Sequence, residues 1–162
     1  MAPYDAPMLE TAEDLTAPRI LQLSIFLPNR IGALQRVVTR LEALDVDIRA
    51  IAIVDSADHA VVRLIVNRSD VAKKALADAG YAAFETELLG VALPDGEFGI
   101  RKLLGALLVA EINVHYVYGL LVRVDGHPVV AVHVDSPDSA GRVLRKAGAM
   151  LVGQDEIDAG DG

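Results

Sequence analysis

Two short turns carry the residue types best suited to holding a small anion. The first spans residues 27–34 (LPNRIGAL) and the second spans residues 93–100 (LPDGEFGI). Each turn follows an apolar run typical of a strand and precedes a run with helical spacing. The first N–H groups of a helix lack internal acceptors and carry partial positive charge, so such a turn suits a carboxylate. We therefore predict a ligand site at each turn.

The sequence offers no catalytic or metal centre beside these turns. It contains no cysteine, which removes disulfides and thiolate metal sites. The four histidines, His59, His115, His127 and His133, lack the spacing of a metal-ligand set. No Ser-His-Asp set or pair of carboxylates can be assembled from the pattern. We expect a protein that is not an enzyme and that needs no metal or cofactor.

The composition bounds the class of protein. Hydrophobic residues make up 52% of the 162 residues and charged residues 23%, which predicts a packed core. A net charge of -8 disfavours nucleic acid as a partner. The longest apolar stretch, residues 103–110, is far shorter than the roughly 20 residues of a membrane span, and the N-terminus does not resemble a secretory signal. We expect a cytoplasmic protein.

The elements that must position the turns follow one order twice. Strands are predicted at residues 20–27, 46–54, 59–66 and 81–87, with helices after the first turn and at 71–79. The order restarts with strands at 88–93, 112–124, 129–134 and 149–152 and helices from 100 and from 137. Each half reads β-α-β-β-α-β, the ferredoxin-like pattern. We expect a flexible arm at 1–18, one unit at 19–87, a second at 88–156 and a frayed tail at 157–162.

The two halves correspond residue by residue. Pro28 matches Pro94, 66 residues later, and Gly80 matches Gly148, 68 residues later. Offsets that stay this constant across a whole unit indicate two copies of one fold.

Among ferredoxin-like families, the residues favour one. An RNA-recognition domain would carry stacking aromatics on the strands at 20–27 and 59–66, and a heavy-metal domain would carry paired cysteines in its first turn. The two turns, the Asp47-Ile48 pair and residues 112–119 (INVHYVYG) instead resemble the ACT domain, over about residues 20–155. The resemblance implies an α+β protein with two ACT units side by side, antiparallel sheets and helices on one face. It also implies that amino acids bind where units meet.

Site residues are carried over from this resemblance. The glycine turn of one unit would face the second strand of its neighbour, which belongs to the same chain or to another copy. The first turn would supply Asn29, Arg30, Ile31 and Gly32, facing Asn113, Val114 and Tyr116. The second turn would supply Asp95, Gly96, Gly99 and Ile100, facing Asp47, Ile48 and Ala50.

The two sites are not equivalent. Asp47 stands where the other unit has Asn113, and an ionised aspartate would repel a ligand carboxylate. The second turn is also one residue longer and carries Glu97. We predict that the site using Asn29 and Asn113 is competent and that the other is weaker.

Plainer interpretations stay open for several of these residues. Gly32 and Gly99 could serve only close helix–strand packing. Tyr116 and Tyr118 share a strand face and could pack within the sheet or an interface. Arg30 could be a solvated turn residue.

We predict a non-enzymatic regulatory module that binds a small metabolite, an amino acid, and acts as a homodimer because exposed sheet edges pair. A regulated enzyme is a further expected partner. The alternatives are a regulatory subunit of the acetolactate synthase small-subunit type, a tandem-ACT transcription regulator of the glycine cleavage type, and a small enzyme.

Overall fold

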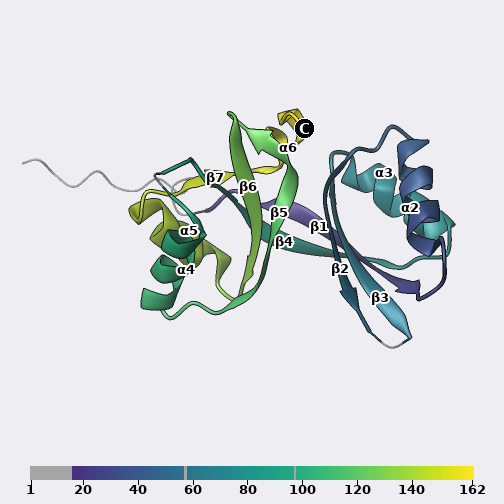
Figure 1. The fold of residues 1–162 in the computed structure, drawn as a ribbon, viewed down its shortest axis with the longest axis horizontal. Helices are drawn as coiled ribbons and strands as arrows, with labels where there is room; N and C mark the ends of the chain where they lie inside the picture. Colours follow the sequence, from purple (N-terminus) through teal and green to yellow (C-terminus); the bar gives the residue numbers. More distant parts are fainter. Residues whose placement is uncertain (1–15, 57, 97) are drawn as a thin grey trace, which may run out of the picture.

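The computed structural model describes residues 16–56, 58–96 and 98–162, so most of the expected N-terminal arm, and Glu97, lie outside the described residues. The elements follow the predicted order twice, which confirms the α+β class with two ferredoxin-like units (Figure 1). The first unit contains β1 (Ile20–Pro28), α2 (Ala33–Glu42), β2 (Ile48–Asp55), β3 (His59–Val66) and α3 (Ser69–Asp78). The second contains α4 (Ile100–Val109), β5 (Val114–Val124), β6 (His127–Val134), α5 (Pro137–Lys146), β7 (Met150–Val152) and α6 (Gln154–Ala159).

The two units share one strand, β4 (Ala83–Ala92). Its first half pairs antiparallel with β1, and its second half pairs with β6 and β7. The sequence predicted separate strands before and after residue 88, but the run AFETELLGVA contains no proline and no turn pair that would end a strand. The single glycine, Gly90, serves a close approach instead, because a Cβ there would lie 2.7 Å from the carbonyl oxygen of Val152.

The strands consequently form one antiparallel sheet in the order β2-β3-β1-β4-β6-β5, with β7 paired to β4. Figure 1 shows α2 and α3 at one end of the molecule and α4 and α5 at the other, with the two halves of the sheet between them. Each helix pair covers one core. The first is built around Leu23, Leu41, Leu64 and Leu76, and the second around Leu89, Leu103, Leu107 and Leu144.

The helix-free faces of the two half-sheets turn toward each other and bury a third apolar cluster. It joins Ile20, Ala50 and Ile65 of the first unit to Val122, Ala131 and Val152 of the second. We call this contact between the two helix-free faces the inter-unit seam. Because β4 runs through both halves, the seam is formed within one chain.

The helices bury the faces that their spacing predicts, with one exception. In α2 the buried residues Ala33, Val37 and Leu41 recur at intervals of one turn. In α4 only Leu103 and Leu107 are buried, whereas Leu104 and Leu108, which also recur at helical spacing, are 41% and 76% exposed. The apolar residues of α4 are therefore more numerous than those that face the core.

The C-terminal residues are ordered rather than frayed. They form α6, whose Ile157 is fully buried, and Asp161 then bridges to Arg123 of β5. Near the other end of the chain, Ala17 belonged to the expected arm but is buried in the second core, beside Gly141 of α5. Short-range patterns missed both because the partners lie more than 30 residues away.

Candidate ligand-binding site

The first turn is held by its own backbone. The N–H of Asn29 donates to the carbonyl of Asp58 at 3.3 Å, and the N–H of Ala33 donates to the carbonyl of Arg30 at 3.1 Å. Gly32 sits at the N-cap of α2 with φ 77°, a left-handed conformation that favours glycine. The turn therefore needs glycine for its backbone shape.

This conformation leaves backbone donors available. Within the described ranges, the N–H groups of Ile31, Gly32, Leu34 and Gln35 donate to no protein acceptor. They belong to the positive end of α2, and no acidic residue occupies the first turn of that helix. A small anion or carboxylate placed here would accept hydrogen bonds that the protein does not supply.

A shallow cavity of about 100 Å³ lies beside these donors. Its lining includes Leu27, Asn29, Arg30, Leu34 and Ile53, all from the first unit. Ile53, which lines the cavity, is half exposed, so an apolar side chain borders the opening. The cavity is thus open to solvent and is not an enclosed pocket, because residues of the first unit line it on one side only.

The second turn differs from the first. Gly99, at the N-cap of α4, has φ -112° and ψ 178°, which any residue adopts, and the left-handed glycine is Gly96 with φ 75°. Phe98 is buried and its N–H approaches the carbonyl of Pro94 at 3.4 Å. Gly32 and Gly99, the N-cap glycines of α2 and α4, therefore have different backbone conformations.

The close-packing interpretation of both glycines is not supported. An added Cβ at Gly99 would meet no atom within 4 Å. At Gly32 it would meet only the flexible guanidinium end of Arg36, at 3.3 Å. Conformation, and not a tight contact, explains Gly32.

The residues predicted to face the turns lie elsewhere within one chain. Figure 1 places the turn after β1 at the outer end of the first unit, whereas Asn113 lies between α4 and β5 of the second. Asp47, predicted to face the second turn, instead bonds with Asn67: its N–H donates to Oδ1 at 2.9 Å and its carboxylate accepts from Nδ2 at 3.1 Å. Neither predicted pair of elements is brought together inside a single copy.

Tyr116 lies in the inter-unit seam. Its hydroxyl accepts a 3.0 Å hydrogen bond from Nε2 of Gln22, and Tyr118 donates to Oε1 of Gln22 at 2.7 Å. Burial raises the pKa of Tyr118 well above its usual range, so its hydroxyl stays a donor. These contacts support the packing interpretation of the two tyrosines.

Sequence reasoning missed three polar residues at this seam: Gln22, Arg63 and His133. Gln22 and Arg63 are the polar exceptions inside the apolar runs ILQLSIFL and HAVVRLIV, and that exception was the available signal. Gln22 is 1% exposed, and Arg63 lies over the Tyr116 ring at 3.8 Å.

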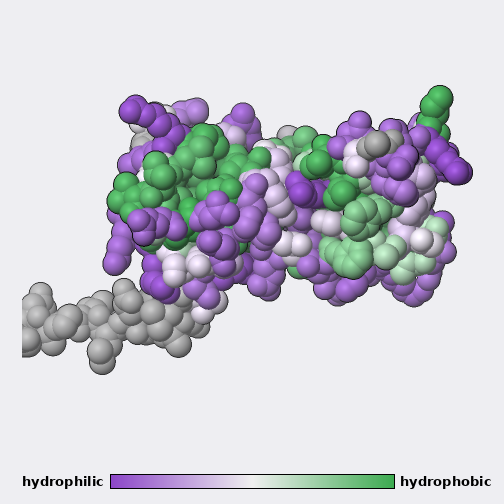
Figure 2. Space-filling model, turned by 90° about the horizontal axis from the view of Figure 1, so that it is seen from below, coloured by the Kyte–Doolittle hydropathy of each residue, from purple (hydrophilic) through white to green (hydrophobic). Residues whose placement is uncertain are grey.

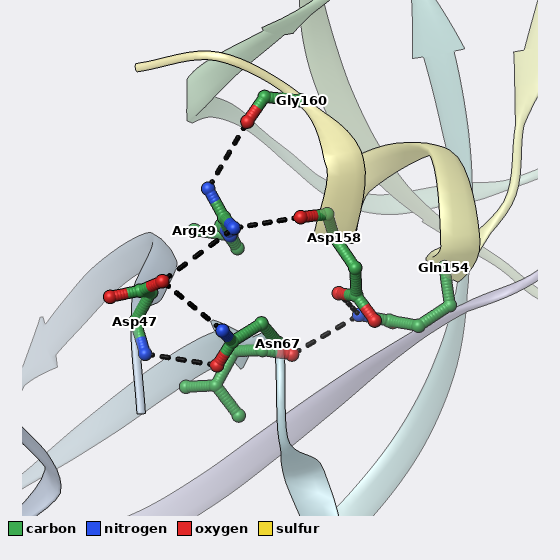
Figure 3. Close-up of polar contacts among 7 residues, drawn as sticks. Asp47, Arg49, Asn67, Gln154, Asp158 and Gly160 are labelled. Atoms are coloured by element: carbon green, nitrogen blue, oxygen red, sulfur yellow. Dashed lines mark hydrogen bonds and ion pairs between the residues drawn. The ribbon is translucent and has the colours of Figure 1, made fainter. Parts of the chain in front are cut away.

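A second polar cluster fastens α6 to the first unit (Figure 3). Gln154 accepts from the N–H of Leu21 at 2.9 Å and donates to the carbonyl of Val66 at 3.1 Å. Arg49 donates to the carbonyls of Asp158 and Gly160, at 2.8 and 3.2 Å, and so caps the C-terminal end of α6. The acceptors of this cluster are met by the chain's own side chains, whereas Nε of Arg49 is buried and has no partner among the described residues. We call this cluster, which joins α6 to the first unit, the α6 clasp.

Comparisons with known proteins agree with this architecture. A family model described as an ACT domain pair matches residues 18–158. The crystal structure of protein BT0572 from Bacteroides thetaiotaomicron is 28% identical, with a TM-score of 0.79 over 88% of this chain and 97% of that one. A comparison with curated proteins returned no match.

Two more distant structures share the fold. The regulatory subunit of aspartate kinase from Thermus thermophilus is 15% identical, with a TM-score of 0.56 over 82% of this chain and 95% of that one. The corresponding subunit from Thermus flavus is 13% identical, with a TM-score of 0.53 over 82% and 94%.

The duplicated unit, the shared strand β4 and the glycine turn before the first helix define the class of fold, a tandem ferredoxin-like protein. The chain belongs to the ACT domain pair family. In the part of the chain that the structure describes, no helix is long and apolar enough to cross a membrane.

Proposed function

We propose that the protein is a non-enzymatic regulatory module of the cytoplasm that binds an amino acid where ACT units of two chains meet. The observation that carries the proposal is the first turn, where Gly32 is left-handed and neighbouring N–H groups have no acceptor among the described residues. Family membership supports a regulatory role.

A free amino acid fits the chemistry of this turn. Its carboxylate would accept from the N–H groups of Ile31 and Gly32, with Arg30 nearby as a cation. The amide of Asn29 can donate or accept, so it can contact either charged end of the ligand. A modest apolar side chain would lie against Leu34 in the cavity beside the turn.

A second copy would close the site. Asn113 and Val114 do not meet the first turn within one chain, and Asn113 is exposed immediately before β5, an edge strand of the sheet. We infer that a homodimer presents Asn113 and Val114 of one copy to Asn29 and Gly32 of the other. Tyr116, two residues further along β5, would hold this strand in position, because its hydroxyl accepts a hydrogen bond from Gln22.

The second set remains a weaker site in this proposal. It would join Asp95, Gly96, Gly99 and Ile100 of one copy to Asp47 and Ile48 of the other. The carboxylate of Asp47 already accepts from Asn67 and lies 3.7 Å from Arg49. It therefore offers a ligand neither a donor nor a free charge, which favours the first turn.

A thermal-shift screen of the twenty amino acids on the full chain tests the proposal. Saturation at about a hundred times Kd adds roughly 2.7 kcal/mol, which raises Tm by about 5–10 °C for a protein of this size. We expect one chemical group of amino acids to do so, with the shift lost in Asn113→Ala. No shift from any amino acid, or an unchanged shift in Asn113→Ala, would contradict the assignment.

The partners that co-purify with the protein show how ligand binding would be passed on as a regulatory signal. A free sensor would purify as a homodimer, whereas a regulatory subunit would purify with its enzyme and a transcription regulator with DNA-binding activity. With a net charge of -8 we expect no nucleic-acid binding.

A further inference from the structure

Arg63 is unusual among the half-buried arginines of the described residues. Arg19 pairs with Asp138, Arg49 caps α6, and Arg142 donates to Ser139. Arg63 has the ring of Tyr116 as its contact and, within the described ranges, no hydrogen-bond acceptor or carboxylate. A cation without a counter-charge is unexpected in a protein with eight more acidic than basic residues.

The contact with Tyr116 uses none of the hydrogen-bond acceptors that Arg63 could pair with. Its guanidinium carbon lies over the Tyr116 ring, 3.8 Å from the ring centroid, which is a cation–π contact. The N–H donors lie in the plane of the guanidinium, at its edge, and form a fork that matches a carboxylate. The cation–π contact thus holds the guanidinium beside the ring, and no described acceptor uses its N–H donors.

Two histidines, His133 and His115, lie next to Tyr116 and Arg63 and add further polar groups to this cluster. The rings of His133 and Tyr116 lie 4.8 Å apart, as do those of His133 and His115. Nδ1 of His133 is buried and has no partner in the described residues. The group therefore combines an unpaired cation with an unsatisfied ring nitrogen, which an anion with a second polar atom would satisfy.

An apolar shelf adjoins this polar group. In the sheet register Arg63 lies between Ala52 on β2 and Ser24 on β1, two small side chains that leave room around it. Further along the same face are Phe26 and Phe84, which are 53% and 55% exposed and pack edge to face. Figure 2 shows hydrophobic surface on the first unit beside hydrophilic residues near the middle of the molecule.

We propose that the open end of the inter-unit seam binds a small organic carboxylate with an apolar body. The carboxylate lies in the fork of Arg63 with His133 and His115 beside it, and the apolar body lies on the shelf of Phe26 and Phe84. This site is separate from the glycine turn, and it contacts both units of one chain. Occupancy would therefore stabilise the seam.

Isothermal titration calorimetry of the full chain with 3-phenylpropionate tests this site. The matched control ligand is 3-phenylpropionamide, which has the same apolar body but no charge. We expect the carboxylate to bind and the amide to bind at least about tenfold more weakly, because a charge-assisted pair is lost. Equal binding of both probes, or no binding of the carboxylate at about 10 mM, would overturn the proposal. Tighter binding of inorganic phosphate than of 3-phenylpropionate would overturn the ligand class.

Variants assign the binding to Arg63. We expect Arg63→Gln to weaken the carboxylate by at least about tenfold, while Arg40→Gln, which removes an exposed arginine on α2, binds as the parent protein does. Equal binding by Arg63→Gln and the parent would contradict the site. If Arg63→Gln does not fold, Arg63→Lys serves instead: its ammonium is no planar fork, so weaker binding is expected and unchanged binding contradicts the proposal.

Amide chemical shifts separate this site from the glycine turn. With 3-phenylpropionate we expect changes at Arg63, Tyr116 and His133. Changes confined to Ile31 and Gly32 would place the carboxylate at the turn, which would overturn this inference while supporting the proposed function.

Discussion

The hydroxyl of Tyr118 donates a 2.7 Å hydrogen bond to Oε1 of Gln22, a residue 96 positions earlier and in the other unit. The amide nitrogen of the same Gln22 donates to Tyr116 and to Ser24, each at 3.0 Å. Gln22 is fully buried, so these bonds replace the water that the amide has in the unfolded chain. One side chain thus ties the register of the two half-sheets at the seam.

Replacing Gln22 with leucine should destabilise the protein by about 1–3 kcal/mol, because two tyrosine hydroxyls lose their partner in a buried place. Equilibrium denaturation in urea measures the change. Gln35→Leu, which alters an exposed glutamine of α2, is the control and should change stability by less than about 0.5 kcal/mol. Equal stability of Gln22→Leu and the parent would show that the seam does not depend on this amide.

A double-mutant cycle isolates the bond itself. Tyr118→Phe and Gln22→Leu should couple by about 0.5–3 kcal/mol, because they remove two ends of one contact. Additive effects would contradict a direct interaction.

Gly32→Ala should destabilise the fold by about 1–2 kcal/mol, since alanine is strained at a φ of 77°. Gly99→Ala should be nearly neutral, because Gly99 is extended and a Cβ there meets nothing within 4 Å. Thermal unfolding of the two variants compares them directly. Equal losses would mean that the two turns have the same backbone shape after all.

The pH dependence of stability should carry a contribution from His133. Burial, then the neighbouring His115 and Arg63, lower its pKa below the ordinary 6.5. Between the lowered pKa and 6.5 the unfolded chain binds more protons than the folded one, so stability falls as pH falls through this window. Below the lowered pKa this contribution stops changing.

Comparing the parent protein with His133→Gln tests the sign, using denaturation between about pH 7.5 and 5. Glutamine does not titrate, so the variant should lose less stability on acidification than the parent. The facing groups His115, Arg63, Tyr116 and Tyr118 are present in both proteins, so the two differ only in the imidazole of His133. A variant that is more acid-sensitive than the parent would reverse the assignment.

We expect α6 to open locally when the hydrogen bonds that fasten it to the first unit are removed. Gln154→Leu removes the bonds to Leu21 and Val66, so amide hydrogen exchange in α6 should accelerate by roughly tenfold or more, while the two cores stay protected. Asp155→Ala, at an exposed neighbour, should leave exchange in α6 within a few-fold of the parent. Unchanged exchange in Gln154→Leu would mean that Ile157 alone holds the helix.

Local sequence patterns were enough to predict the two folded units, but they did not predict how the units contact each other. The spacing of Val37 and Leu41, and the constant offset between Pro28 and Pro94, predicted the duplicated fold, because a periodic apolar face must be buried. They could not predict that β4 continues through the expected boundary at residue 88. That outcome depends on pairing partners as distant as β1 and β7.

For the same reason, only the backbone turn of the candidate site could be predicted from the sequence. The first turn could be read from Pro28 and Gly32, because its shape is set by adjacent residues. The meeting of Gln22 with Tyr118, or of Arg63 with His133, depends on how two faces dock, and no periodicity encodes that.

In the proposed function, the first turn holds an amino-acid carboxylate between two copies of the chain. Amide chemical shifts recorded during titration with the amino acid that gives the largest thermal shift test it most directly. We expect the largest changes at Ile31, Gly32 and Leu34, together with changes at Asn113 and Val114 from the facing copy. Changes at other residues with these five amides unmoved would contradict it.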